Sequence, residues 1–126
     1  MLQKLSDAEL EIMKIVWENA DETTLFSYLM DSLAAQGRPC QKNTLIVLLS
    51  RLVNKGFLSV RKKGRKNEYI PLVSEAEYQT MQTQNFIDKI YEGSVKGLVA
   101  NLIAGDLITD EEYEELKKLL EGGKGE

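Results

Sequence analysis

The sequence predicts a mainly α-helical protein that contains one β-hairpin and is divided into two small parts. Apolar residues recur at helical spacing along most of the 126 residues, and an alternating pattern interrupts this spacing once, between residues 57 and 72. The charge also changes sign: residues 1–73 carry 11 basic and 8 acidic side chains, whereas residues 74–126 carry 5 and 12. We therefore expect one domain over residues 1–73 and a second over residues 74–126.

The composition excludes most classes of enzyme and metalloprotein. The chain has no histidine and one cysteine, Cys40, so a structural zinc site, a histidine-based catalytic triad and an intrachain disulfide all lack residues. No apolar run reaches the roughly 18 residues of a membrane span, and residues 1–11 lack the apolar core of a signal peptide. We expect a cytoplasmic protein that is not an enzyme and needs neither cofactor nor metal.

Three capping boxes predict where three of the helices begin. In each box a hydroxyl residue precedes a glutamate by three positions and is followed by apolar residues at helical spacing. The boxes are Ser6 with Glu9, Ser74 with Glu77, and Thr109 with Glu112. The first helix should run through Trp17, which we expect in the core. The second is expected over residues 75–91 and the third over 110–120, with a short apolar helix over 95–103 between them and a flexible tail over 122–126.

Two further helices are expected between the first two capping boxes. Thr24 is predicted to cap a helix that Gly37 ends, because glycine is favoured just after a helix. The second is predicted over residues 41–55 and is followed by Gly56. The apolar faces of the two helices are formed by Leu25, Leu29 and Leu33, and by Leu45, Leu48, Leu49 and Leu52.

Residues 57–72 have the pattern of a β-hairpin. Two apolar stretches, 57–60 and 69–72, flank a basic turn around Gly64. The order helix, helix, helix, hairpin predicts a winged helix-turn-helix, which is three helices plus a β-hairpin wing, followed by a small all-helical domain. Because parts of about 50 to 70 residues bury little core alone, we expect the C-terminal helices to form a dimerisation domain.

The basic residues of the N-terminal part are concentrated in one segment. Between Arg38 and Asn67 there are nine basic residues and no acidic one. On a winged helix the wing cations would hold phosphates, and Gln41 to Asn43, with Ile46 and Val47, would meet base edges at the start of a recognition helix. The alternative interpretations are a solubilising loop and further core at Ile46 and Val47. A winged helix that binds another protein is a third possibility.

Five stretches of the sequence resemble the penicillinase repressor (BlaI/MecI) family. Residues 5–17 read LSDAELEIMKIVW, residues 43–57 read NTLIVLLSRLVNKGF, and residues 69–73 read YIPLV. Further on, residues 85–91 read NFIDKIY and residues 98–102 read LVANL, and the similarity continues over 111–120. The resemblance therefore covers nearly the whole chain.

The resemblance implies a homodimeric bacterial repressor that binds a palindromic double-stranded DNA operator. Recognition helix 41–55 and basic wing 57–72 would contact the DNA. Derepression would follow a β-lactam or cell-wall signal from a membrane sensor, with cleavage between Asn101 and Leu102. The implied DNA-binding residues are Gln41, Lys42, Asn43, Thr44, Ile46, Val47, Arg51, Lys55, Lys62, Lys63, Arg65 and Lys66.

The chain departs from the usual family pattern at several positions. Cys40 replaces a tryptophan before the recognition helix, Ile46 and Val47 replace a long polar or basic residue and a threonine, and Leu102 replaces phenylalanine at the cleavage site. Base contacts would therefore be more apolar. No cysteine follows Cys40, so thiolate copper sensing is not supported. A redox signal through Cys40 is the alternative to β-lactam signalling.

Overall fold

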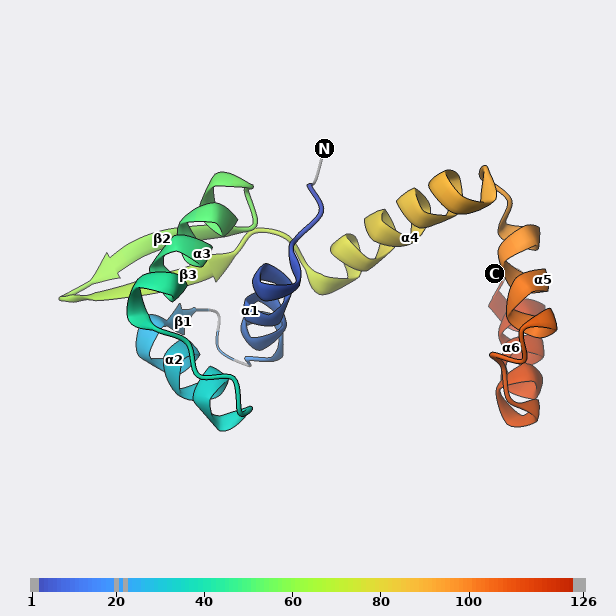
Figure 1. Cartoon of the computed structure of the whole chain (residues 1–126), viewed down its shortest axis with the longest axis horizontal. Helices are drawn as coiled ribbons and strands as arrows, with labels where there is room; N and C mark the ends of the chain where they lie inside the picture. The colour runs from blue at the N-terminus through green and yellow to red at the C-terminus, as the bar shows by residue number, and fades with distance from the viewer. Residues whose placement is uncertain (1–2, 20, 22, 124–126) are drawn as a thin grey trace. The chain divides into compact units, whose positions relative to one another are not determined.

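The computed structural model describes residues 3–19, 21 and 23–123 (Figure 1). Its contacts divide the chain into two compact units, Met1–Gln82 and Thr83–Glu126, which we call the N-terminal and C-terminal units. The elements in chain order are α1 (Asp7–Glu18), β1 (Thr24–Leu25), α2 (Phe26–Ala35), α3 (Lys42–Asn54), β2 (Leu58–Lys63), β3 (Lys66–Pro71), α4 (Glu75–Tyr91), α5 (Val95–Ala104) and α6 (Asp110–Gly123). This order confirms the predicted mainly helical, winged helix-turn-helix fold.

The N-terminal unit packs three helices against a small antiparallel sheet. Helix α1 contacts α2 and α3, and the sheet has the strand order β1-β3-β2 (Figure 1). The buried face of α3 consists of Leu45, Leu49 and Leu52, as predicted, while Leu48 is half-buried at the edge of the core. Helix α3 therefore has one side fixed in the core and the other exposed.

All three predicted capping boxes are present. At the start of α1, the Ser6 hydroxyl accepts a hydrogen bond from the Glu9 amide at 3.2 Å, and the Glu9 carboxylate accepts one from the Ser6 amide at 2.8 Å. The same reciprocal bonds join Ser74 with Glu77 and Thr109 with Glu112. Each box satisfies amides that a helix N-terminus leaves unpaired.

The first turns of α4 belong to the N-terminal unit. Tyr78 is buried there: its ring lies 5.5 Å from that of Phe57, and its hydroxyl accepts a hydrogen bond from the Leu5 amide at 2.9 Å. Trp17, which was expected in the core, is half-buried and packs against it, and its indole N–H donates to the Val73 carbonyl at 2.9 Å. These contacts explain why the compact units divide inside α4 and not at Val73, where the charge changes sign.

The prediction that Thr24 caps the second helix is wrong. Thr24 is buried in β1, where it pairs with Tyr69 of β3, and its hydroxyl accepts a hydrogen bond from the Asn19 side-chain amide at 3.0 Å. Helix α2 instead begins after Leu25, which provides no side-chain cap. Its end is as predicted: Gly37 has a φ of +75°, which favours glycine just after a helix.

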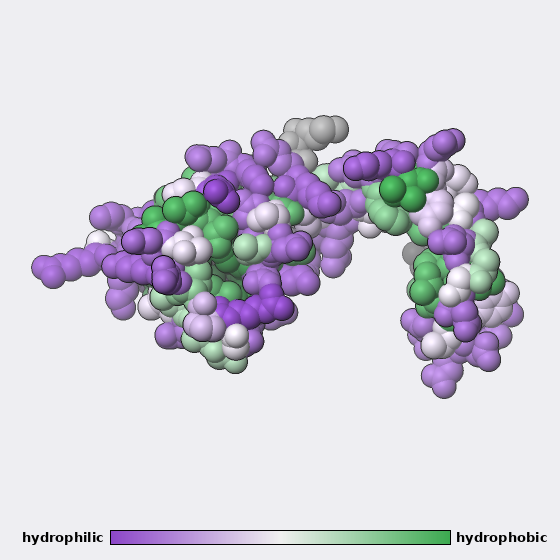
Figure 2. All heavy atoms as spheres, viewed as in Figure 1, coloured by the Kyte–Doolittle hydropathy of each residue, from purple (hydrophilic) through white to green (hydrophobic). Residues whose placement is uncertain are grey.

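The C-terminal unit contains the rest of α4 together with α5 and α6. Helix α6 continues through Gly123, so Gly122 and Gly123 are helical where a flexible tail was expected; residues 124–126 lie outside the described residues. Ile87 is the one buried apolar residue of this unit among those that the structure describes, and other apolar side chains reach the surface over these helices (Figure 2). Within the described ranges, no helix is long and apolar enough to cross a membrane.

Candidate nucleic-acid interface

Helix α3 presents an exposed polar and apolar face from its first turns. Lys42, Asn43 and Thr44 are exposed, and Gln41 stands just before the helix as its N-cap residue. Ile46 and Val47 are 43% and 49% exposed, which excludes the interpretation that they are further core. Apolar side chains on the outer face of a helix are available to touch a partner, and the methyl group of thymine is one such apolar surface.

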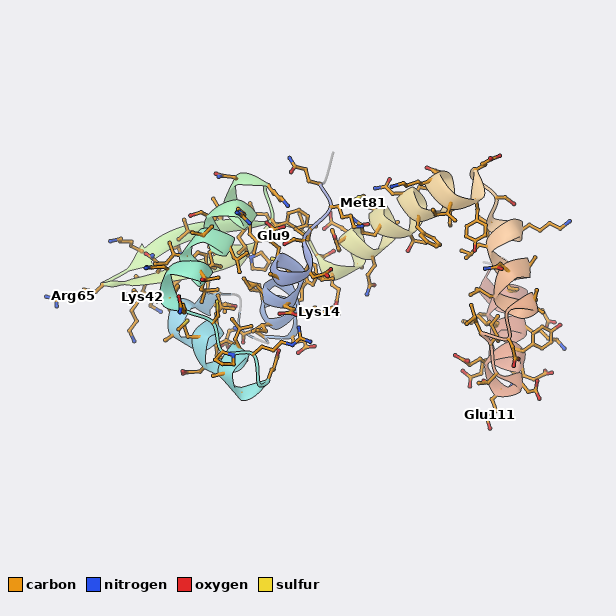
Figure 3. All side chains as sticks on the ribbon, viewed as in Figure 1. Glu9, Lys14, Lys42, Arg65, Met81 and Glu111 are labelled. Carbon is orange, nitrogen blue, oxygen red and sulfur yellow. The ribbon has the colours of Figure 1, made fainter. Side chains whose placement is uncertain are left out.

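The predicted hairpin is the wing of the fold. Strands β2 and β3 pair from Leu58 with Pro71 to Lys63 with Lys66, which leaves Gly64 and Arg65 as a two-residue turn. Gly64 has a φ of +66°, a backbone conformation that tight hairpin turns require. Arg65 extends from the tip of the hairpin, and Lys42 lies at the start of α3 (Figure 3). The hairpin therefore carries basic side chains beyond the packed body of the unit.

A groove of about 710 Å³ lies between α3 and the wing. Lys42 and Ile46 of α3 line it, and across from them lie Val60, Lys66 and other residues of the hairpin. Three cations (Lys42, Arg65 and Lys66) are among its lining residues, and no carboxylate is among the described residues that form it. A concave surface with this charge attracts an anionic polymer.

The wing also contains one acidic residue, Glu68, which the basic pattern of the sequence did not reveal. Glu68 is 4% exposed and faces Arg61 across the strand pair; the Arg61 guanidinium donates to its carboxylate at 2.8 Å. Lys63 lies 3.8 Å from the other carboxylate oxygen, which also accepts a hydrogen bond from the Thr23 hydroxyl at 3.4 Å. The hydrogen bond from Arg61 lowers the pKa of Glu68, so the carboxylate is charged at neutral pH. The register of a two-residue turn would have revealed this pair.

Lys55 is engaged inside the N-terminal unit. Its ammonium donates to the buried Glu9 carboxylate at 2.6 Å and to the Lys4 carbonyl at 3.2 Å. Burial raises the pKa of Glu9, but hydrogen bonds from Lys55 and Ser6 outweigh this effect and the pKa is lowered. Lys55 therefore ties the end of α3 to the start of α1 and does not join the cations around the groove.

The remaining predicted residues differ in what they contact. Arg38, at the start of the basic segment, forms an ion pair with Glu11. Cys40 is half-buried beside the core, and its thiol donates to the Gln41 carbonyl at 3.4 Å. Among the residues that the structure describes, five cations of the basic segment have no ion pair: Lys42, Arg51, Lys62, Arg65 and Lys66. The described part of the chain also contains no cluster of side chains that could hold a metal ion.

Known proteins resemble the chain over nearly all of its length. Residues 5–122 match the family model described as "Penicillinase repressor". The penicillinase repressor of Bacillus licheniformis is 32% identical over 123 residues, covering 98% of this chain and 94% of that protein. The methicillin resistance regulatory protein MecI of Mammaliicoccus sciuri is 30% identical over 117 residues, covering 93% of each chain.

Two solved structures resemble the N-terminal part of the fold. The DNA-binding domain of the repressor BlaI matches with a TM-score of 0.53 and 31% identity, covering 62% of this chain and 92% of that one. The monomeric form of Bacillus licheniformis BlaI in complex with the blaP half-operator matches with a TM-score of 0.51, 31% identity and the same coverage. The chain therefore belongs to the penicillinase repressor (BlaI/MecI) family of winged-helix, DNA-binding transcriptional repressors.

Proposed function

We propose that this protein is a homodimeric repressor that binds an inverted-repeat operator through α3 and the wing. The observation that carries this proposal is the groove between them, which has three cations and no described carboxylate in its lining. The B. licheniformis relative that was solved with a half-operator supports the same assignment. Phosphate contacts made by wing cations would fix the position of the protein on the duplex, and α3 would read the sequence.

The sequence is read by the exposed face at the start of α3. The amides of Gln41 and Asn43 have the donor and acceptor pair that recognises adenine in the major groove. Ile46 and Val47 provide apolar contacts that suit the thymine methyl group, so the operator should be rich in A·T pairs where these side chains reach it. Thr44 and Arg51, which also belong to the predicted contact set, are exposed on the same helix.

Dimerisation is assigned to the C-terminal unit. Its described residues expose ten large apolar side chains, nine on the three helices and Leu107 between α5 and α6. The nine are Phe86, Ile90, Val95, Val99, Ile103, Tyr113, Leu116, Leu119 and Leu120. A second copy of the chain offers the same apolar surface in return, which is the usual arrangement of a two-fold dimer. A two-fold dimer presents two copies of α3, and the matching DNA sequence is a palindrome.

Derepression is assigned to cleavage between Asn101 and Leu102 after a β-lactam or cell-wall signal. This bond lies inside α5, where the Asn101 side-chain amide donates to the Tyr91 hydroxyl at 2.9 Å. Cutting α5 would divide the apolar surface that the dimer needs. Intact protein in fully derepressed cells would contradict this route and would favour another signal.

The DNA upstream of the gene provides the test of operator binding. The double variant Lys42→Ala/Arg65→Ala should weaken binding to every sequence and reduce the salt dependence. Lys4→Ala/Lys14→Ala removes the same charge from exposed positions outside the groove and is the matched control. Equal affinities of the two double variants would contradict the assigned interface. Asn43→Ala should instead change which operator sequence is preferred.

A wild-type protein with no affinity for its upstream DNA at low salt would reject the proposed function. That result would favour a winged helix that binds another protein. Footprinting of the upstream region supplies the operator length and its symmetry in the same experiment.

A further inference from the structure

The basic side chains of the wing divide between the two faces of the sheet. Side chains alternate along a strand, so Val60 and Lys62 share one face of β2, while Arg61 and Lys63 share the other. Val60 and its partner Tyr69 line the groove beside α3. A smaller hollow on the other face is lined by residues that include Thr23, Lys63 and Glu68, and no described residue of α3 lines it. Lys66, the strand partner of Lys63, lines both this hollow and the groove, and it forms no ion pair with a described residue.

Glu68 occupies a central position on the face that is turned away from α3. It lies in β3, the middle strand, opposite Leu25 on one side and Arg61 on the other. Both carboxylate oxygens are used: Oε2 accepts from Arg61 at 2.8 Å, and Oε1 contacts Thr23 at 3.4 Å and Lys63 at 3.8 Å. Its side chain is only 5% exposed with these partners in place.

A buried carboxylate needs a cation more than an exposed cation needs a carboxylate. The Arg61 and Lys63 side chains are 62% and 79% exposed, so each could turn to solvent at little cost. Glu68 would then lose both of its cationic partners and keep only the hydrogen bond from the Thr23 hydroxyl. Glu68 therefore keeps both cations beside its carboxylate. Arg61 lies closer, at 2.8 Å, than Lys63, at 3.8 Å.

We propose that Glu68 is a positioning residue that withholds Arg61 and Lys63 from the DNA and leaves the phosphate contacts of the wing to Lys62, Arg65 and Lys66. This inference rests on the proposed function, because it concerns which cations meet the phosphates. Glu68 carries one negative charge and neutralises one of the two cations, which then releases no counterion when DNA binds. The other cation is held on the face of the wing that is turned away from α3. The five basic residues of the wing would then act as about three.

Lys62 and Lys63 form a matched pair for testing this division. They are adjacent, exposed and identical in charge, but they lie on opposite faces of β2. The probe is a fluorescent mixed-sequence duplex about four helical turns long, with affinity measured over a series of salt concentrations. Lys62→Ala should reduce the slope of log affinity against log salt by about one unit per protomer, whereas Lys63→Ala should leave it nearly unchanged.

The second variant, Glu68→Gln, keeps the side-chain shape and removes the charge. With Arg61 and Lys63 released, the salt slope should become steeper by between about one and two units per protomer. Adding Arg61→Ala and Lys63→Ala to Glu68→Gln should return the slope to the wild-type value. A residue that merely stabilised the hairpin would weaken binding when replaced and would not steepen the slope. Circular dichroism and thermal unfolding establish that each variant is folded.

Each result decides the inference separately from the proposed function. Equal effects of Lys62→Ala and Lys63→Ala would overturn the inference, and so would a folded Glu68→Gln protein with an unchanged slope. If Glu68→Gln fails to fold, the lysine pair decides alone. A wild-type protein with no salt-dependent DNA binding would reject the proposed function itself.

Discussion

The two units differ in where their apolar side chains lie. The N-terminal unit buries residues from α1, α2, α3, both wing strands and the start of α4 in one continuous core. The C-terminal unit has helices of similar length, but Ile87 is the one apolar residue that its described part buries. Helical stability in proteins comes mostly from packing an apolar face. The first unit therefore buries its apolar residues within one chain. The second exposes an apolar surface that a partner could cover.

The largest expected effect comes from placing charge on the apolar surface of the C-terminal unit. Leu119→Glu/Leu120→Glu should convert the proposed dimer to a monomer, because the partner surface would have to desolvate two carboxylates. Without two linked sites, the affinity for a palindrome should fall by about 10² to 10⁴. Light scattering gives the mass, and Glu111→Gln on the same helix is the control. If the double variant stays dimeric, the C-terminal unit does not use these leucines to pack against a partner copy.

A large effect is also expected when the core of the N-terminal unit is truncated. Leu49 is 1% exposed, and Leu49→Ala should lower the free energy of unfolding by about 2 to 5 kcal/mol, since the cavity cannot fully collapse. Urea unfolding measures this change, and Ser50→Ala, at the exposed neighbouring position, is the control. A loss below 1 kcal/mol would contradict a tightly packed core around Leu49.

The ion pair between Glu9 and Lys55 tests whether the N-terminal unit depends on pH. The folded-state pKa of Glu9 lies below its ordinary value of 4.5, so its stabilisation is present above that value and is lost as the pH falls through the folded pKa. Glu9→Gln should cost about 2 kcal/mol at neutral pH, and the two proteins should converge in acid. Unfolding at both pH values checks this, with the exposed Glu18→Gln as control. If the free energies of unfolding of the two proteins differ by the same amount at both pH values, the lowered pKa of Glu9 would be contradicted.

The smallest expected effect concerns a helix cap in the C-terminal unit. The Ser94 hydroxyl accepts a hydrogen bond from the Gly97 amide at 2.9 Å, and Ser94→Ala should destabilise α5 by about 1 kcal/mol. Amide hydrogen exchange within α5 measures the change, and Ser94→Asp should restore protection. If the alanine variant exchanges like the wild type, packing across the dimer and not the cap sets the stability of α5.

Local sequence patterns predicted the elements whose stability is local. The capping boxes at Ser6, Ser74 and Thr109 and the turn around Gly64 each involve neighbours in the chain, so their spacing was informative. Strand β1 was missed because two residues carry no periodic pattern, and Thr24 becomes a strand residue only by pairing with β3. Tertiary structure here overrides a cap preference.

The sequence predicted where the candidate interface lies. It did not predict which of its basic residues form ion pairs. The start of α3 and the basic tip were predicted from residue spacing together with the run of basic residues, and both are exposed. The basic segment was treated as free of acids because Glu68 lies one residue beyond Asn67, although strand register places it opposite Arg61. Lys55 could not be assigned from sequence, since its partner Glu9 is 46 residues away.

The position of Asn101 and Leu102 has a consequence for the lifetime of the repressor. Their peptide bond lies within α5, and Asn101 is also joined to Tyr91. A protease needs an extended segment, so the bond can be cut only while α5 is locally open. If a partner copy stabilises α5, opening is rarer in the dimer than in a dissociated chain. The half-life of the protein in the cell would then depend on the fraction of chains that are dimeric. Dissociated chains would be cleaved first.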